Sequence, residues 1–389
     1  MKIGFLLGAG VSLPFAPTTS SLTERLLRGD DVHRHSDGTY FLSKEKYPAL
    51  DNQESIDRIR SLLDFLKEHA DRFFGQRKVR DRRAHYEDLY YSVTQLADAI
   101  DDFENPAINE LLEKAGRLFI MPPLSRGPAF QSEDLFDETR RYMKGIISHS
   151  LTALQPDQDH LRQIVHAAQD RSFSRVEIFT LNHDLLVERT LENAGIQFSN
   201  GFVNCSDDLD SWDRASFARS RIKVRLTKLH GSVDWYPMRF SPQGPSVVCI
   251  PTNGDPDHAR GPNGRFAELL PDRPVMLVGT FNKMMEYTMG IYADLFCAFR
   301  TALWSLDSVI VSGYSFSDKG VNASLVEWTR QNRERRLLII APHASDYAQT
   351  ARGAIRHLFS DCGAQIEKKN EKFKDVDWNQ IRAWHRIRR

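Results

Sequence analysis

The chain opens with the stretch MKIGFLLGAGVS, residues 1–12. Its apolar run ends in the turn Gly8-Ala9-Gly10, and a helical pattern follows over residues 20–28. A strand, a glycine turn and a helix in this order are typical of the first unit of an α/β phosphate-binding fold. Glycines let the backbone approach a phosphate, and a helix N-terminus favours its charge. Because Leu13 stands where a third glycine would complete G-x-G-x-x-G, an ordinary tight turn remains the alternative.

Short apolar runs further along the chain predict buried strands. They cover residues 175–181, 224–229, 275–279, 308–313 and 336–341. Helical patterns alternate with them, over residues 185–193, 286–306, 319–331 and 344–359. The alternation predicts an α/β fold with a Rossmann-like, mostly parallel sheet and helices on both faces. Residues 237–274 are rich in Pro, Gly, Asn and Asp, and we expect a loop-rich insert there.

The residues between the first helix and the second strand follow a different pattern. Apolar residues recur at helical spacing over 52–118, and helices are expected over 132–154 and 159–169. We therefore predict a helical insert module, residues 29–170, which divides a Rossmann-like domain into residues 1–28 and 171–366. Residues 367–389 are predicted to form a basic C-terminal tail. Its large apolar residues recur every three positions, which predicts an amphipathic helix: Trp378, Ile381, Trp384 and Ile387.

The composition narrows the class of protein. Of 389 residues, 41% are hydrophobic and 27% are charged, which excludes wholesale disorder and fibrous classes. Lys+Arg and Asp+Glu are both 52, so contact with nucleic acid would need a local basic patch. Apolar runs such as residues 275–278 are far too short to span a bilayer, and glycines break the N-terminal run. We therefore expect a cytoplasmic protein that does not bind membranes.

Polar residues stand at the ends of the predicted strands, where ligands bind in parallel sheets. Asn182 and Asp184 follow one strand; they suit a binding site, and equally a helix N-cap. His183 between them is interpreted as structural. His230 follows another strand and suits either a general base or a hydrogen-bonded structural role. Asp234 is its candidate orienting partner or merely a solvated acid.

The stretch from residue 312 to residue 318, SGYSFSD, follows another predicted strand. Its hydroxyl side chains and backbone N–H groups suit a phosphate or a ribose. A turn with a Ser or Asp helix cap is the alternative.

Four motifs in order carry a family resemblance. They are GAGVS at 8–12, TLNHD at 180–184, KLHG at 228–231 and GYSFSD at 313–318. Together they resemble the sirtuin-like (silent information regulator) superfamily, and more closely its bacterial anti-phage defence branch. The resemblance covers residues 1–28 and about 175–360. It implies a Rossmann-like fold that binds NAD.

The resemblance also implies roles for single residues. The pyrophosphate of NAD would be held by Gly8, Ala9, Gly10 and Ser12. Asn182 and Asp184, with Thr180 before them, match the motif that binds nicotinamide and its ribose. His230 matches the catalytic His that activates a ribose hydroxyl or water. Gly313 and Ser315 match the Gly-x-Ser that contacts phosphate and adenosine ribose. Asp318 and Asn322 are typical of the bacterial branch, with less clear roles.

The sequence departs from the protein-deacylating sirtuins at two places. These enzymes carry a four-cysteine zinc ribbon after the His-Gly, whereas residues 232–274 hold only Cys249. They also carry Gly-Ile-Pro-Asp-Phe-Arg after the glycine turn, whereas this chain reads LPFAPTTS over residues 13–20. We therefore expect no zinc and predict an NAD+ glycohydrolase with Asn182, Asp184 and His230 as catalytic residues. A deacylase, or a module that only binds NAD or ADP-ribose, is the alternative.

The resemblance also implies a setting for the activity. Such effectors deplete NAD to stop phage growth and are activated by oligomerisation or by a partner, for example a HerA-like hexameric ATPase. A homo-oligomer is therefore expected. Two basic segments, residues 72–83 and the tail, suit indirect involvement with nucleic acid or a partner contact, or are solvated helix faces. The helical insert is open to the roles of lid, oligomer contact or partner surface.

Overall fold

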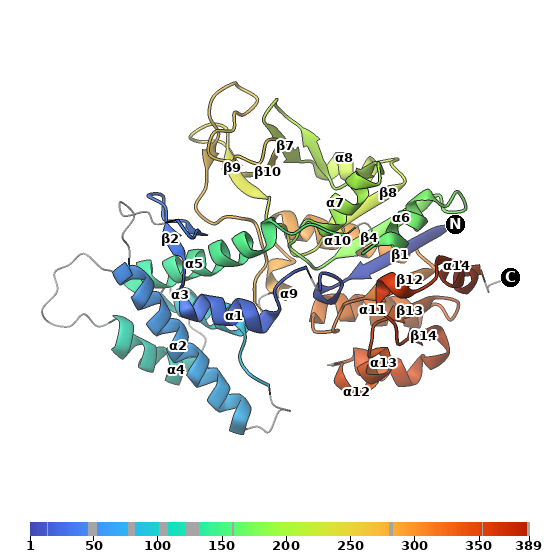
Figure 1. Cartoon of the computed structure of the whole chain (residues 1–389), viewed down its shortest axis with the longest axis horizontal. Helices are drawn as coiled ribbons and strands as arrows, with labels where there is room; N and C mark the ends of the chain where they lie inside the picture. The colour runs from blue at the N-terminus through green and yellow to red at the C-terminus, as the bar shows by residue number, and fades with distance from the viewer. Residues whose placement is uncertain are drawn as a thin grey trace, which may run out of the picture.

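A computed structural model describes most of the 389 residues. The described ranges are 1–13, 15–45, 53–76, 82–100, 108–120, 132–157, 159–279, 283–351 and 353–386. Within them the chain folds into a central parallel sheet with covering helices, a helical module beside it and a smaller antiparallel sheet (Figure 1). None of the helices in these ranges is long and apolar enough to cross a membrane.

A seven-stranded sheet forms the centre of the molecule. Its strands are β1 (Lys2–Leu7), β4 (Arg175–Thr180), β5 (Phe198–Ser199), β8 (Val224–Lys228), β12 (Ser308–Ser312), β13 (Arg336–Ile340) and β14 (Ile366–Lys369). Their order is β14-β13-β12-β1-β4-β8-β5, and every neighbouring pair is parallel. β1 therefore lies in the middle, between β12 and β4. This arrangement confirms the predicted Rossmann-like fold.

Helices cover both faces of this sheet, which explains why most of its strands are apolar along their length. One face is covered by α10 (Gly290–Trp304), α11 (Lys319–Gln331) and α13 (Ile355–Asp361). The other face is covered by α6 (Arg162–Gln169), α7 (Leu186–Asn193) and α14 (Trp378–Arg386). Leu6 joins the first core, whereas Phe5 and Leu7 join the second, because successive side chains of a strand point to opposite faces.

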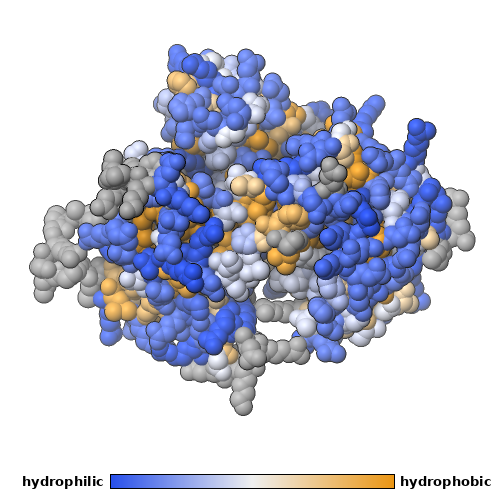
Figure 2. Space-filling model, in the orientation of Figure 1, coloured by the Kyte–Doolittle hydropathy of each residue, from blue (hydrophilic) through white to orange (hydrophobic). Residues whose placement is uncertain are grey.

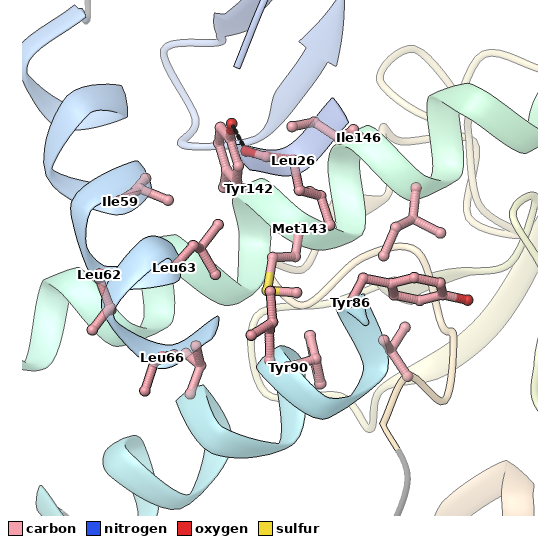
Figure 3. Packing of buried hydrophobic residues seen from close by; sticks show 14 of the residues in the cluster. Leu26, Ile59, Leu62, Leu63, Leu66, Tyr86, Tyr90, Tyr142, Met143 and Ile146 are labelled. Atoms are coloured by element: carbon pink, nitrogen blue, oxygen red, sulfur yellow. Dashed lines mark hydrogen bonds between the residues drawn. The ribbon is translucent and has the colours of Figure 1, made fainter. Parts of the chain in front are cut away.

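A helical module lies beside the sheet. It consists of α1 (Thr19–Arg28), α2 (Gln53–Gln76), α3 (Tyr86–Ile100), α4 (Asn109–Ala115) and α5 (Ser132–Thr152), with the hairpin of β2 (Val32–Arg34) and β3 (Tyr40–Leu42). Leu63 of α2, Tyr90 of α3 and Met143 of α5 meet in one buried cluster (Figure 3). The hydroxyl of Tyr142 donates to the carbonyl of Leu26 at 2.8 Å, which ties α5 to α1.

The packing departs from the predicted domain boundaries at three places. The prediction assigns α1 to the Rossmann-like domain, but its Leu22 and Leu26 lie in the core of the helical module. It assigns α6 to the insert, but α6 packs on the central sheet. It ends the domain at residue 366, but β14 continues to Lys369 and pairs with β13. Periodicity reveals an apolar face and says nothing of which neighbour covers it.

The C-terminal segment is part of the sheet domain. α14 lies where the amphipathic helix is expected, and its Ile381 and Trp384 are buried against the sheet. The guanidinium of Arg336 in β13 lies over the Trp384 ring, 5.1 Å from its centroid. Trp384 is therefore used inside the molecule rather than on a partner surface.

A second, smaller sheet includes three short strands from the region predicted to be rich in loops. Its strands are antiparallel, in the order β11-β9-β10-β7-β6. They are β6 (Phe202–Asn204), β7 (Leu209–Trp212), β9 (Tyr236–Arg239), β10 (Val247–Pro251) and β11 (Glu268–Leu269). Leu209, Met238 and Cys249 form its small core. Residues 237–274 are therefore loop-rich as expected, and the three strands within them were not predicted because they are short and contain proline or charged residues.

Three expected elements take another form. Residues 275–279 are not a strand: only Met276 forms an isolated bridge, to Gly231, although the run is apolar because it is buried. The helix expected over 286–306 is divided into α9 (Lys283–Glu286) and α10. The helix expected over 344–359 is divided into a 3-10 turn, α12 (Tyr347–Thr350) and α13. Gly290 and Gly353, both with positive φ, mark the two interruptions.

Candidate active site

Four strand ends come together at one edge of the central sheet. β12, β1, β4 and β8 are neighbours in this order, and all run in the same direction. Their carboxyl ends therefore carry the four motifs side by side: residues 8–12, 180–184, 228–231 and 313–318. In Figure 1 the turn after β1 lies between the sheet and the helical module, and Figure 2 shows the surface hollowed between these parts.

The glycine turn after β1 packs directly against the turn after β12. The N–H of Gly10 donates to the carbonyl of Gly313 at 2.8 Å. A Cβ on Gly8 would lie 2.6 Å from that carbonyl oxygen, and a Cβ on Gly313 would lie 2.2 Å from the backbone nitrogen of Val11. Contact between the two turns therefore requires these glycines. Ala9 and Gly10 are exposed, so their backbone is accessible to a ligand.

Asn182, Ser12 and Asp184 form a buried polar cluster that joins the ends of β1 and β4. The Asn182 amide donates to the carbonyl of Gly8 at 3.1 Å and to the hydroxyl oxygen of Ser12 at 2.9 Å. Ser12 in turn donates to Asp184 Oδ2 at 2.6 Å. Asp184 Oδ1 accepts from the N–H of Leu186 at the start of α7. Asp184 therefore binds Ser12 through one carboxylate oxygen and the first residue of α7 through the other.

A buried ion pair lies beneath this loop. The ammonium group of Lys228, at the end of β8, donates to the backbone carbonyl of Asp184 and lies 2.8 Å from Glu188 Oε1. The Thr180 hydroxyl oxygen accepts from the N–H of Asn182 at 3.1 Å. Burial raises the pKa of Glu188 against the opposing effect of Lys228. These contacts fix the backbone between residues 180 and 188.

His230 forms a triangle of polar contacts with Tyr287 and Asp318. Its Nε2 lies 2.8 Å from the Tyr287 hydroxyl and 3.0 Å from Asp318 Oδ2. The Tyr287 hydroxyl donates to the same Oδ2 at 2.8 Å. Asp318 also caps α11, because its Oδ1 accepts from the N–H of Val321 at 3.0 Å. His230, at 3% relative exposure, and Asp318, at 4%, are both buried.

The electrostatics of the triangle select one form of the imidazole. Burial disfavours the charged form of Asp318, but the hydrogen bond from His230 and the N–H of Val321 outweigh it, so the pKa of Asp318 is lowered. Burial, with the charge of Lys283, lowers the pKa of His230 despite Asp318. An ionised carboxylate has no proton to donate, so Nε2 carries the hydrogen. Nδ1 is then the nitrogen that can accept a proton.

The family comparison covers much of this site. A family model described as a SIR2-like domain matches residues 176–366, a range that includes Asn182, His230 and Asp318. This match supports the expected place in the sirtuin-like superfamily. The glycine turn of residues 8–12 lies outside the matched range but is held against it by Gly313.

Comparison with solved structures gives Sir2 proteins at low identity. A Sir2 homologue in complex with NAD is 15% identical, with a TM-score of 0.37, and the alignment covers 100% of this chain and 91% of that chain. A Sir2 bound to an acetylated peptide is 11% identical, with a TM-score of 0.37, and coverage is 99% and 93%. A search of curated proteins gave no match.

One sequence interpretation around His230 changes. Asp234 is not its orienting partner, because Asp318 and Tyr287 take the Nε2 side. His183 is buried, with its ring centroid 6.2 Å from that of His230. Burial, and then the charge of a protonated His230, hold the pKa of His183 well below its usual value. Tyr287 went unpredicted because it belongs to no motif.

The loop after β12 is held by its own residues. The Tyr314 hydroxyl donates to Asn322 Oδ1 at 2.7 Å, and the Asn322 amide donates to the carbonyl of Phe316 at 2.8 Å. Ser315 is exposed, with its hydroxyl 3.1 Å from that of Ser317. Asn322 therefore shapes the loop after β12, whereas Ser315 is presented to solvent at the sheet edge.

The described ranges show no candidate metal centre, and several arginines of the two basic segments are paired. These ranges contain no group of three or more His, Cys, Asp or Glu residues arranged to hold a metal ion. In the basic segment 72–83, of which residues 77–81 lie outside the described ranges, Arg72 pairs with Glu68 and Arg82 with Asp88. In the C-terminal segment, whose residues 387–389 also lie outside, Arg382 pairs with Asp170.

Proposed function

We propose that this protein is an NAD+ glycohydrolase, which cleaves the bond between nicotinamide and ribose. The observation that carries the proposal is a buried imidazole, His230, which burial keeps neutral and which the ionised Asp318 orients beside the Asn182 cluster. This arrangement stands at the ligand-binding edge of the sheet in a SIR2-like domain. A neutral imidazole at such a place suits a general base near neutral pH.

The reaction is balanced with water as the second reactant. The bond from ribose to the nicotinamide nitrogen breaks, and its electron pair leaves with neutral nicotinamide. Water adds to the ribose carbon, which gives ADP-ribose and one proton. His230 Nδ1 accepts that proton. Because positive charge develops on the ribose, fixed dipoles and the Asp184 carboxylate stabilise the transition state more than a strong nucleophile would.

The remaining polar groups suit the rest of the substrate. The exposed backbone at Ala9 and Gly10 is assigned the pyrophosphate, with Ser12 behind it. Gly313 and Ser315 are assigned the phosphate and adenosine ribose. The N–H groups of the Asn182 amide donate to the carbonyl of Gly8 and to the hydroxyl oxygen of Ser12. Its amide oxygen is therefore the group assigned to a ribose hydroxyl or to water. Thr180, Asp318 and Asn322 act on the loops that carry these groups.

The biological setting follows from the resemblance. We propose an anti-phage effector that depletes NAD and is activated by assembly, either as a homo-oligomer or with a HerA-like hexameric ATPase. The zinc-dependent deacylase alternative receives no support from the sequence after His230. Size measurement of the purified chain, with and without its genomic neighbour, tests the assembly.

The first experiment measures release of nicotinamide from NAD by the purified protein, alone and co-expressed with its genomic neighbour. We expect His230→Ala and Asn182→Ala each to reduce release by at least about 100-fold, the usual range for a lost base. His258→Ala serves as the matched control, because His258 is exposed and pairs with Asp255 in the loop after β10. Circular dichroism and melting temperature check that each variant folds.

Each other outcome has a definite meaning. Full activity of His230→Ala would refute the assigned base. Absence of release in both states, with NAD or ADP-ribose still raising the melting temperature, would favour a binding module. Release of nicotinamide only with an acetylated peptide, one for one, would favour a deacylase.

A further inference from the structure

Tyr287 reaches the catalytic base from outside the four strand-end motifs. It lies between α9 and α10, and its hydroxyl is 2.8 Å from both His230 Nε2 and Asp318 Oδ2. Its side chain is buried. No other described hydroxyl contacts both members of the His230–Asp318 pair.

The ring of Tyr287 is held in place on two sides. It stacks on Phe296 of α10, with centroids 4.3 Å apart and planes at 10°. Gly320 of α11 packs against the other part of the ring, because a Cβ there would lie 3.0 Å from the ring carbon Cε2. The hydroxyl therefore has a fixed position relative to Asp318, which is the geometry that a positioning residue needs.

We propose that Tyr287 is a positioning residue for the general base: its hydroxyl shares Asp318 with His230 and so keeps the imidazole in the form whose Nδ1 accepts a proton. The proposal rests on the proposed hydrolysis of NAD. Two donors, the His230 imidazole and the Tyr287 hydroxyl, share one carboxylate oxygen of Asp318. When the tyrosine hydroxyl is removed, the Oδ2 atom of Asp318 interacts with His230 alone, and it stabilises the protonated imidazole more strongly.

Several charged groups around His230 set its pKa together with Asp318. Asp318 faces it from the start of α11, Lys283 from α9, Glu87 from α3 and His183 from the loop after β4. Lys283 lowers the pKa of His230, whereas Asp318 and Glu87 raise it. Burial and Asp318 hold the pKa of Tyr287 well above its usual value, so its hydroxyl keeps its proton and remains a donor to Asp318.

The test compares Tyr287→Phe with the unmodified protein across pH. Phe keeps the ring stack on Phe296 and removes only the hydroxyl. We expect the acid limb of the rate of nicotinamide release to move to higher pH by about 0.5–1 unit, with the alkaline plateau largely kept. Tyr292→Phe, in the adjacent first turn of α10, is the control, because Tyr292 has no hydrogen bond to His230 or Asp318 in the described structure.

A second readout works without turnover. Titration of the His230 imidazole by NMR, in uniformly labelled protein with His230→Gln to assign the signal, measures its pKa and tautomer directly. We expect Tyr287→Phe to raise that pKa. An unchanged pKa and an unchanged acid limb would overturn the role of Tyr287. A protein that releases no nicotinamide in any state but shows the NMR shift would overturn the hydrolysis and leave the role of Tyr287 in place.

Discussion

His230 receives its orientation from a residue 88 positions further along the chain. Asp318 contributes one carboxylate oxygen to a helix cap and the other to the imidazole. The Asp318 side chain therefore links the start of α11 to the tautomer of His230, which determines which ring nitrogen can accept a proton. The sequence predicted His230 from its place after a strand, but nothing in the spacing indicated this partner, and the nearer acid Asp234 was the wrong choice.

A substitution at Asp318 can separate its two roles, the cap of α11 and the contact with His230. Asp318→Asn keeps an oxygen for the cap of α11, since Asn and Asp cap helices about equally well. The buried donors of His230 and Tyr287 lose their acceptor, so we expect the free energy of unfolding to fall by about 1–3 kcal/mol. The neutral amide no longer fixes the Nε2–H form, so we expect nicotinamide release to fall about 100-fold or more.

The control is another capping aspartate. Asp213 caps α8 (Arg214–Arg219) by accepting from the N–H groups of Ala215 and Ser216, away from the site. Asp213→Asn should leave the rate unchanged. Equal rates for the unmodified protein and Asp318→Asn would exclude the proposed role of the carboxylate.

Among the elements, the central strands were predictable and the small antiparallel sheet was not. β12 and β13 are apolar because helices cover both of their faces, so the sequence carries their position plainly. β14 reads IEKK and β9 reads YPMR, so neither has an apolar run to detect. Their strand conformation is imposed by pairing with a neighbour, which is a tertiary effect.

The site shows the same division. Residues at the ends of predictable strands, such as Asn182 and His230, were found because parallel strands bring their ends together. Tyr287 was missed because it lies in residues 286–306, which were predicted to be helical, and an aromatic residue in such a segment resembles a core residue. The two hydrogen bonds that distinguish it depend on how α9 and α10 lie against α11.

The turns after β1 and β12 act as one element, and a pair of glycine substitutions tests this. Gly313 and Gly195 both have positive φ, of 63° and 66°. A Cβ on Gly195 meets no atom within 4 Å, so Gly195→Ala should cost about 1–2 kcal/mol of unfolding free energy from backbone strain alone. Gly313→Ala adds a clash with the backbone of Val11, so we expect a clearly larger loss in chemical denaturation.

Gly313→Ala should also abolish nicotinamide release, because the turns must separate to admit the methyl group. Similar stability of the two variants would show that the turns can move apart at little cost.

At the scale of the whole molecule, a charged residue of the helical module influences the pKa of His230. Glu87 of α3 lies 3.5 Å from the ammonium group of Lys283 on α9, and both act on His230. Glu87→Gln removes the charge that raises the pKa of His230 and leaves Lys283, which lowers it. We therefore expect the acid limb of the rate to move to lower pH by a few tenths of a unit, opposite to the shift in Tyr287→Phe.

Glu110→Gln provides the comparison within the same module. Glu110 is exposed on α4 and pairs with Lys114. The same shift in both variants would indicate a general change in net charge. A shift confined to Glu87→Gln would show that this contact joins the module to the site.

The position of β1 bears on synthesis of the protein. β1 is made well before its neighbour β12, which follows roughly three hundred residues later, and such distant pairing is slow to form. The group that would cleave NAD needs Ser12 from one end of this span and Asp318 from the other. A nascent chain still on the ribosome therefore carries no assembled site until α11 has emerged. Translation that stops before α11 would yield a fragment that lacks Asp318 and therefore the contact that orients His230.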